Sequence, residues 1–585
     1  MIDLSSVPNI PPGFIFIFGA VLLPLLGKGK ARTIYLIILA ALGLISVAVM
    51  REPQTSWVFS DLIFLQVDRL SLFMGYIFTI AGGCAILYSL PSVKDNGHHM
   101  CALLYLGSAL GAVFAGDFFS LYIFWEIMAF SSLGLIWYEG SQRARDAGMR
   151  YILFHLFGGC ALLGGIVLHY MSTGSIAIGP VEYGIGYFLL LLGIGVNTGF
   201  ILLHTWLPDS YPKATIAGTI FLSIFTTKTG VYVLARTFSG AEISIHGQEF
   251  LFVAYIGGAM CLYGVIFAIL QNDVRKLLSY HIVSQLGYMV AGVGMGALGL
   301  GVIATEAQEL AIDGAFAHLF NNLLFKTTLF MCMGAVIYRT GKNNLTDMGG
   351  LAKKMPITMI TCVIAALSIS GIVGFNGFIS KGMVIHAAEM EELHLLVLVL
   401  TLGSVGTLIS FIKLTYFAFF SKNKDIEAKE APIFMLIPMC VTAFLCIAIG
   451  VHPQLLYNIL PFVEATTHYH AFASGHTVGV VELVLMTVFL FFMIGFFAPH
   501  EKITYDVDYI YRKIGRGFIR ACEGPLVNFA SAVEKKVLKF VDFIVKFSEN
   551  PRRETRLGIG TGVLLVILFF VLYLITMFMA GWLSP

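Results

Sequence analysis

The sequence has few charged residues and lacks the motifs with which proteins hold redox centres or nucleotides. Only 12% of its 585 residues are charged and 58% are hydrophobic, far more apolar sequence than a soluble core needs. The nine cysteines form no C-x-x-C pair and belong to no recognisable iron–sulfur, haem or zinc ligand set. A Walker A loop is also missing, and no G-x-G-x-x-G stands in the strand-to-helix context that a dinucleotide fingerprint requires. We therefore expect no cofactor and no metal on this chain, so energy for any ion movement comes from elsewhere.

Long apolar runs fill most of the chain instead. About 16 of them approach the roughly 20 residues with which a helix crosses the hydrocarbon core of a bilayer. The runs are continuous and do not alternate, which excludes a transmembrane β-barrel. The sequence therefore predicts an all-α polytopic membrane protein with about 16 transmembrane helices.

Basic residues follow the odd-numbered runs far more often than the even-numbered ones. Examples are Lys28, Arg143, Arg275, Lys353 and Lys422. By the positive-inside rule, the connections after odd-numbered spans are cytoplasmic and the N-terminus lies outside.

The most informative stretch runs from Asn197 to Arg236. It is almost wholly apolar but contains Lys228, and a lysine in the middle of a membrane span costs roughly 2.5–3.5 kcal/mol unless it faces a partner or water. His204 stands just before a break centred on Pro208, where we expect it to be accessible to water. Lys228 is therefore a candidate functional residue. For His204, the sequence favours a role in a proton relay and a structural role equally.

Glu126 is the first ionisable residue that the sequence places deep in a span. It follows Asp117, the expected N-cap of its helix, by about two and a half turns. A buried carboxylate is protonated or paired, and Lys228 is its natural partner. The alternative is a carboxyl group that only forms a hydrogen bond with a neighbouring helix.

For His155 we favour a packed histidine with one hydrogen bond over a role in a proton relay.

The second half of the chain repeats this pattern. His318 and Lys326 are eight residues apart and share a helix face, about 12 Å apart along the axis. Asn321 and Asn322 lie between them, so this face can host a chain of water molecules. A hydrogen-bonded seam between helices is the structural alternative.

A second broken helix is expected between residues 365 and 382. Glycines interrupt the apolar run there, and Lys381 stands at its end. Broken helices at matching positions of two halves are typical of transporters built from repeats. Lys413 is expected to extend to the cytoplasmic surface, with a cytoplasmic gate as the alternative.

The tail has a different composition. Residues 500–556 are charged and amphipathic, with lysines between apolar residues at helical spacing, which predicts a helix along the cytoplasmic surface. It acts as a brace against a neighbouring subunit or as a membrane anchor. Residues 557–581 form the last predicted span.

Six motifs together resemble the antiporter-like membrane subunits of respiratory complex I, of Mrp sodium/proton antiporters and of membrane-bound group 4 hydrogenases. The resemblance covers about residues 65–455. The motifs are F-W-E at Phe124–Glu126, H-x-W-L-P-D at His204–Asp209, K-x-G-x-Y at Lys228–Tyr232, Q-N-D-V-R-K-L-L-S-Y at Gln271–Tyr280, A-x-A-H to F-K-x-x-L-F at Ala315–Phe330 and G-F-x-S-K at Gly377–Lys381.

The resemblance implies two inverted five-helix repeats in a core of fourteen helices, each repeat forming a half-channel. It implies that Glu126 pairs with a neighbouring lysine and that Lys228 serves the first half-channel. It further implies a central relay of His318 and Lys326, with Lys381 near the exit. The expected parts are three N-terminal helices in 1–98, a first half-channel in 99–236, a second in 250–420, peripheral helices in 432–498, the lateral helix in 500–556 and a final span in 557–581.

Four positions depart from the family pattern. Asn197 stands where many relatives have a lysine seven positions before the H-x-W-L-P-D histidine, and asparagine cannot carry the charge. Asn322 and Tyr211 replace usual histidines, and Thr215 replaces a usual proline. The first half-channel is therefore altered or inactive, or Glu126 pairs with Lys228 instead.

The resemblance implies a subunit that translocates protons, with sodium as the other candidate ion, within a multisubunit complex in the cytoplasmic membrane of a prokaryote. Its partners would be the lipid bilayer, other membrane subunits and peripheral iron–sulfur subunits, and no nucleic acid. As part of a redox-driven translocase it would carry no redox centre. The alternatives are a non-conducting structural subunit, a subunit of a stand-alone Mrp-type antiporter, and a substrate or inorganic-carbon transporter on the same fold.

Overall fold

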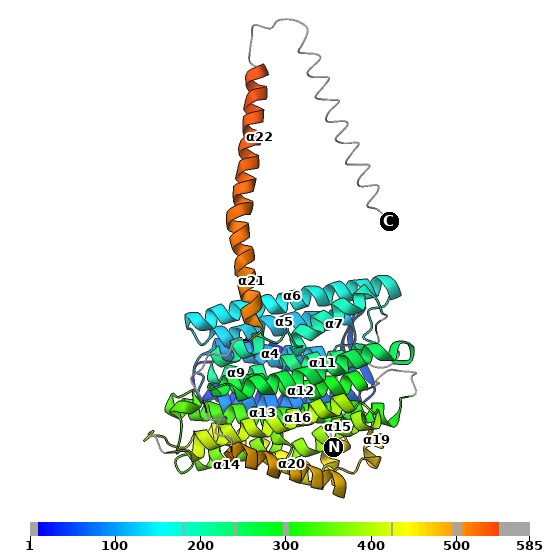
Figure 1. The fold of residues 1–585 in the computed structure, drawn as a ribbon, viewed down its shortest axis with the longest axis vertical. Helices are drawn as coiled ribbons and strands as arrows, with labels where there is room; N and C mark the ends of the chain where they lie inside the picture. The colour runs from blue at the N-terminus through cyan, green and yellow to red at the C-terminus, as the bar shows by residue number, and fades with distance from the viewer. Residues whose placement is uncertain are drawn as a thin grey trace. The chain divides into compact units, whose positions relative to one another are not determined.

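The computed structural model describes residues 10–179, 181, 183–238, 243–296, 304–422, 425–493, 499 and 506–548. The chain divides into two compact units, Met1–Thr504 and Tyr505–Pro585. In the first unit, long helices lie side by side in a layered bundle (Figure 1). The predicted final span, residues 557–581, lies outside the described residues.

Helices account for nearly all regular structure in the described part of the first unit. Its α-helices and strands are α1 (Pro12–Leu22), α2 (Lys30–Ala48), β1 (Gln54–Phe59), β2 (Leu62–Val67), α3 (Arg69–Ser89), α4 (Asn96–Phe114), α5 (Phe118–Trp137), α6 (Gln142–Thr173), α7 (Ile185–Thr198), α8 (Trp206–Ser210), α9 (Ile216–Ile224), α10 (Thr226–Phe238), α11 (Ile243–Ile269), α12 (Val274–Met295), α13 (Glu306–Thr340), α14 (Pro356–Ser370), α15 (Asn376–Met390), α16 (His394–Thr415), α17 (Ile433–Val451), α18 (Gln454–Tyr457), α19 (Val463–His468) and α20 (Ser474–Met493).

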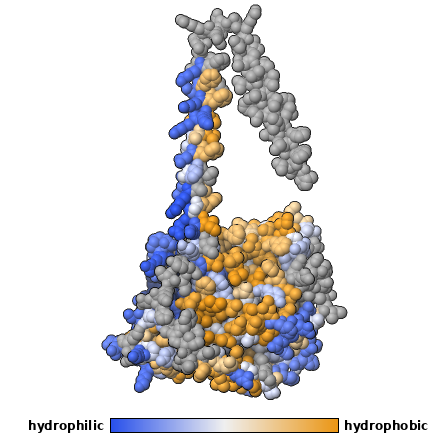
Figure 2. Space-filling view, viewed as in Figure 1, coloured by the Kyte–Doolittle hydropathy of each residue, from blue (hydrophilic) through white to orange (hydrophobic). Residues whose placement is uncertain are grey.

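The helices have the length and surface that a bilayer requires. Within the described residues, ten candidate spans are long and apolar enough to cross a membrane, and four shorter apolar helices accompany them. Figure 2 shows apolar surface over the middle of the bundle and hydrophilic surface toward the ends of the helices. The prediction of a helical polytopic membrane protein is confirmed.

A β-hairpin departs from the all-α prediction. Strands β1 and β2 pair antiparallel, from Gln54 opposite Val67 to Phe59 opposite Leu62. Asp117 binds this hairpin to α5, because its carboxylate accepts the backbone N–H of Ile63 at 2.7 Å and that of Ser120 at 2.8 Å. The expected N-cap is therefore confirmed, and its second role in holding the hairpin was not visible in the sequence.

Two helices are interrupted by glycines in the left-handed conformation. Helix α7 ends at Gly199 (φ +75°) and α14 ends at Gly371 (φ +78°). Each is followed by a short connection and then by α8 or α15, respectively. The second predicted break is thus confirmed, but Lys381 lies within the second turn of α15 rather than at the end of a span.

A third interruption was not predicted, and it lies next to Lys228. Helices α9 and α10 are separated at Phe225, and the backbone N–H of Thr226 donates to the hydroxyl of Tyr105 at 3.1 Å instead of continuing the helix. The carbonyl of Ser223 then accepts from Lys228 Nζ at 2.8 Å. The break therefore supplies the acceptor that holds the buried ammonium group.

The second unit contains an amphipathic helix, as predicted for the tail. It consists of α21 (Asp508–Ala521), a π-helical turn (Cys522–Leu526) and α22 (Val527–Ser548). Figure 2 shows one hydrophilic and one apolar face along it. Exposed apolar residues include Phe518, Phe529, Val537, Phe540 and Phe543. Such a helix is suited to a membrane surface or a partner protein.

Candidate functional site

Lys326 lies in the fully buried middle of α13. Its Nζ donates to the carbonyl of Leu278 on α12 at 3.0 Å and lies 5.7 Å from the ring centroid of Phe411 on α16. An ammonium group has three donors, and this hydrogen bond uses one of them. A buried ammonium group with so few polar partners is energetically costly. Such a cost is expected at a site where a side chain gains and loses charge.

His281 faces the same aromatic ring, and sequence reasoning missed it. Its imidazole centroid lies 4.7 Å from that of Phe411, and its ring nitrogens have no hydrogen-bond partner among the described residues. It also interacts electrostatically with Lys326. The signal was present, because a histidine inside an apolar run is rare in a membrane helix.

His318 connects α13 with the second broken helix. Its Nδ1 lies 3.1 Å from the hydroxyl of Ser380, the neighbour of Lys381 on α15. The imidazole ring also lies 5.1 Å from the ring of Tyr288 on α12. Lys381 Nζ lies 5.0 Å from the centroid of that same Tyr288 ring. The structure thus brings together His318 and Lys381, both of which the sequence had selected.

The predicted polar ladder on α13 is divided. Asn321 is bound to the second broken helix, since it donates to the carbonyl of Asn376 at 2.8 Å and accepts from the Asn376 amide at 3.1 Å. Asn322 is buried, and both of its amide atoms lack a partner in the part of the chain that the structure describes. Asn321 therefore forms a structural seam, whereas Asn322, one turn from Lys326, has free hydrogen-bonding capacity.

Lys228 and Glu126 do not form the ion pair considered from the sequence. Lys228 is fully buried and donates to the carbonyl of Ser223, whereas Glu126 is only half-buried, one turn from Tyr122 on its own helix. The carboxylate of Glu126 packs closely against Gly159 of α6. It therefore faces α6 rather than Lys228, because the register of α5 points it toward the outer side of the bundle.

The lysines of the two halves lie near enough to interact. Lys326 interacts electrostatically with both Lys228 and Lys381, and His318 does so with the same two lysines. Like charges in a medium of low polarity repel strongly. A positive charge on one of these side chains therefore raises the energy of a charge on the next.

The other histidines of the first half are packed. His155 Nδ1 lies 2.7 Å from Asn197 Oδ1, and its ring lies 4.2 Å from Tyr151 and 4.6 Å from Trp206. The prediction of a packed, singly bonded histidine agrees with this geometry. His204 is fully buried with its ring 5.0 Å from that of Tyr263, so the expectation of a water-accessible side chain is wrong.

Lys413 does not reach the cytoplasmic surface, so that prediction is also wrong. It is buried, and its Nζ donates to the carbonyls of Ile269 at 2.7 Å and Gln271 at 2.9 Å. These carbonyls lie at the C-terminal end of α11, where helices leave acceptors unsatisfied and favour a cation. Lys413 therefore caps α11 from α16.

Asp209 of the H-x-W-L-P-D motif lies on α8, outside the candidate membrane spans, and forms an ion-pair cluster with Arg150 and Lys213. It accepts from Arg150 Nε at 2.7 Å and from Lys213 Nζ at 2.6 Å. Burial alone raises the pKa of Asp209, but the two cations outweigh burial and lower the pKa from 3.8 to about 2. Asp209 therefore stays charged and joins α8 to α6.

No group of three or more His, Cys, Asp or Glu residues suited to a metal ion occurs among the described residues. The chemistry that this interior offers is that of lysine, histidine and amide groups in an apolar surrounding. Such groups can pass protons or hold a monovalent cation transiently.

Comparison with known proteins identifies the family. Residues 115–410 match the family profile described as the transmembrane region of NADH:quinone oxidoreductase and Mrp antiporters. The chain is an antiporter-like membrane subunit of the complex I and Mrp family. This family also includes the corresponding subunits of membrane-bound group 4 hydrogenases. The matched region contains Glu126, Lys228, His318, Lys326 and Lys381.

Relatives within this family are Na+/H+ antiporter subunits A. That of Alkalihalophilus pseudofirmus is 31% identical over 439 residues, which is 68% of this chain and 54% of the relative. That of Bacillus subtilis is 30% identical over 402 residues, 64% of this chain and 50% of the relative. The chain thus spans about half the length of the curated relatives that it matches.

Two solved structures share the fold. A chain of the Mrp complex from Dietzia sp. DQ12-45-1b superimposes with a TM-score of 0.70 at 20% identity, covering 83% of this chain and all of that one. A chain of the archaeal membrane-bound sulfane sulfur reductase superimposes with a TM-score of 0.71 at 24% identity, covering 97% of this chain and all of that one. Both assemblies are described as complexes, the second as an archaeal respiratory membrane complex, and the resemblance concerns the fold.

Proposed function

We propose that this chain is a cation-translocating, antiporter-like subunit that carries protons, with sodium as the alternative ion, within a multisubunit membrane complex. The observation that supports this most strongly is the buried set of Lys228, His318, Lys326 and Lys381. Lys326 and His318 each interact electrostatically with Lys228 and Lys381 in a largely apolar interior. A merely structural bundle gains nothing from several weakly compensated cations.

In this mechanism, repulsion between like charges drives the movement. A cation that arrives at Lys326 raises the electrostatic energy of a charge at Lys381 and at Lys228. Loss of the cation from one site then favours uptake at the next. His318 passes protons toward Lys381, because its imidazole contacts Ser380, the residue next to that lysine. In bulk water this repulsion is screened, so the low polarity of the interior is what couples the sites.

The first half-channel lacks one of the lysines that carry charge in many relatives. Asn197 occupies a lysine position of many relatives and binds His155, so this step of the path carries no charge of its own. Glu126 then serves a lysine of a neighbouring subunit rather than Lys228, since it faces outward beside α6. His204, beside the first break, completes the set of candidate relay residues.

The finer architecture follows the same family pattern. We propose two inverted five-helix repeats around the two broken helices, with about 16 transmembrane helices in all. The N-terminus lies outside a prokaryotic cytoplasmic membrane, and the amphipathic helix α21–α22 lies along its cytoplasmic face. The partners are other membrane subunits and, in a redox-driven complex, peripheral iron–sulfur subunits.

A second candidate function is a non-conducting structural subunit of a redox-driven complex. Two observations favour it, namely the asparagine at position 197 and the unpaired arrangement of Glu126 and Lys228. Under this alternative the buried lysines of the second half would be retained without transport. Transport measurements on the intact complex separate the two.

The experiment is purification of the complex in mild detergent, identification of its subunits by mass spectrometry, and reconstitution into liposomes. Cation movement that requires this chain, measured with a pH-sensitive dye and sodium flux, is the expected result. Co-purifying cluster-binding subunits would indicate a redox-driven translocase, and small hydrophobic subunits alone a gradient-driven antiporter. Full assembly and full redox activity with no cation movement would support the structural alternative.

A further inference from the structure

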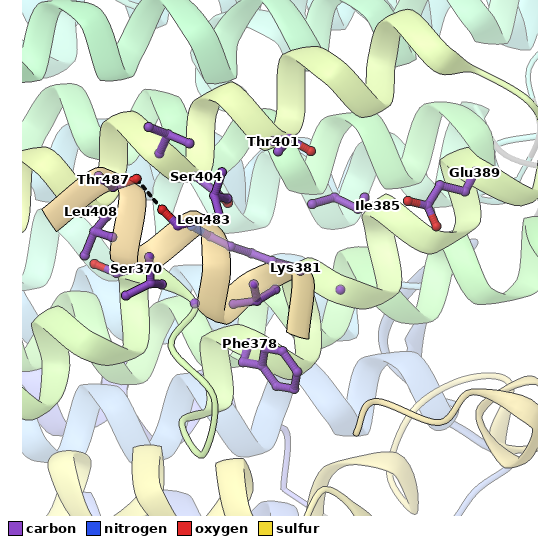
Figure 3. Close-up of a pocket in the computed structure, with 16 residues that line it drawn as sticks. Ser370, Phe378, Lys381, Ile385, Glu389, Thr401, Ser404, Leu408, Leu483 and Thr487 are labelled. Carbon is purple, nitrogen blue, oxygen red and sulfur yellow. Dashed lines mark hydrogen bonds between the residues drawn. The ribbon is translucent and has the colours of Figure 1, made fainter. Parts of the chain in front are cut away.

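A cavity of about 320 Å³ lies beside Lys381 and is lined by residues of α14, α15, α16 and α20 (Figure 3). Lys381 itself is buried, and its Nζ has no hydrogen-bond partner within the described residues. The ammonium group contacts the face of Tyr288 but donates no hydrogen bond to the described residues, and water in the adjacent volume can accept from it.

The walls of the cavity can hold water. Its lining includes the hydroxyl-bearing residues Ser370, Thr401, Ser404 and Thr487, which come from three different helices. Since one water molecule occupies about 30 Å³ in the liquid, the volume admits on the order of ten of them. Water bonded to these hydroxyls would also hydrate the ammonium group of Lys381.

Glu389 marks the other end of the same cavity. It follows Lys381 by eight residues on α15, so the two residues share a helix face about 12 Å apart along the axis. Its side chain is 54% exposed and lies 3.3 Å from Nδ1 of His386. The cavity therefore joins a buried cation to a carboxylate that reaches the molecular surface.

Helix α20 forms one wall of this cavity. Gly479, Val480, Leu483, Val484 and Thr487 of α20 line it (Figure 3). Leu485, on another face of the same helix, is 64% exposed and does not line the cavity. Substitutions at positions 483 and 485 thus compare the two faces of one helix.

We propose that this cavity is a water-filled passage through which cations move between Lys381 and Glu389, with α20 as its outer wall. The proposal rests on the proposed function and adds the route and its terminal carboxylate. The ions that the passage fits are protons and small monovalent cations, because hydroxyl groups and the Glu389 carboxylate offset the Lys381 ammonium group and the apolar side chains that also line it. The apolar side chains of Val480, Leu483 and Val484 line the passage from α20, so their size limits the flow.

The first test measures water access without measuring transport. Leu483→Cys and Leu485→Cys are introduced into the intact complex in native membrane vesicles, and both are treated with a charged methanethiosulfonate reagent, which reacts with thiols in water. We expect Leu483→Cys to be labelled at least tenfold faster than Leu485→Cys, with the wild-type chain giving the background from its own cysteines. Equal rates, or no labelling of Leu483→Cys, would overturn the proposal.

The second test measures flow through the passage. Leu483→Trp fills the cavity and should lower cation transport at least tenfold, whereas Leu485→Trp should leave it within twofold of wild type. Glu389→Gln should lower transport several-fold, whereas Glu392→Gln, an exposed neighbour outside the cavity, should not.

The two proposals fail in different ways. If wild-type complex transports cations but Leu483→Trp and Glu389→Gln match it, the passage is overturned and the proposed function stands. If the wild-type complex transports no cations, the proposed function fails. Labelling of Leu483→Cys would then show only that water fills the cavity. Because no cations would move through that water, the passage would be overturned as well.

Discussion

Lys381 holds its ammonium group 5.0 Å from the ring centroid of Tyr288, on a different helix. The hydroxyl of that tyrosine donates to the carbonyl of Leu400 at 2.6 Å and lies 2.9 Å from the hydroxyl of Ser404. The ring is therefore fixed by α16 while its face attracts the cation. This contact links α12, α15 and α16 at the residue that begins the proposed passage.

Replacement of Tyr288 tests this contact. Because a cation over an aromatic face gains about 0.5–2 kcal/mol, Tyr288→Leu should lower the transport rate about tenfold. Tyr288→Phe keeps the ring and should retain most of the transport. The measurement is proton uptake by reconstituted complex. Equal losses in both variants would show that the hydroxyl bonds, and not the ring, matter.

Removal of the Asn197 side chain should affect stability rather than transport. Asn197→Ala leaves the ring of His155 without its hydrogen-bond partner, which costs about 1–3 kcal/mol in a buried site. Thermal unfolding in detergent measures the loss, and transport should stay within about twofold. The double variant Asn197→Ala with His155→Phe should recover part of the stability, since both polar groups are then gone. Lost transport with unchanged stability would instead place Asn197 in the path.

The ion-pair cluster around Asp209 predicts a pH dependence of stability. Because its pKa is lowered from 3.8 to about 2, the charged carboxylate stabilises the fold fully above about pH 4. This contribution is lost as the pH falls through 4 toward 2. Asp209→Asn should therefore lower the free energy of unfolding by about 1–2 kcal/mol at pH 7, a value that already allows for the partial exposure of Arg150. This loss should become smaller as the pH falls from 4 toward 2.

Unfolding of wild type and Asp209→Asn at pH 7, 5 and 3 measures this dependence. Asp146→Asn, an exposed aspartate on α6, is the control and should show little change at any pH. A cost for Asp209→Asn that stays constant down to pH 3 would contradict the assigned ion pairs.

The sequence predicted which residues belong to the candidate site, because that depends on composition. It did not predict their contacts, because those depend on helix register and packing. Lys228, His318, Lys326 and Lys381 were recognisable because an ionisable residue within an apolar run is costly and rare. Their partners were not, since a backbone carbonyl such as that of Leu278 leaves no sequence signal.

Two corrections show the same limit. Glu126 and Lys228 do not form an ion pair, because the rotation of α5 about its axis directs Glu126 toward α6. No local sequence pattern specifies that rotation. Lys413 was expected at a surface because long lysines often extend there, but the C-terminal carbonyls of α11 lie within its reach. The break at Phe225 also arises from a tertiary contact, the bond between Thr226 and Tyr105.

The most direct test of the account replaces Lys326 in the reconstituted complex. Lys326→Ala should abolish cation movement while the complex assembles with its full set of subunits, and Lys342→Ala, an exposed lysine beyond the end of α13, should transport like wild type. Cation movement at the wild-type rate in assembled Lys326→Ala complex would contradict the account, because the buried relay could then not be the path.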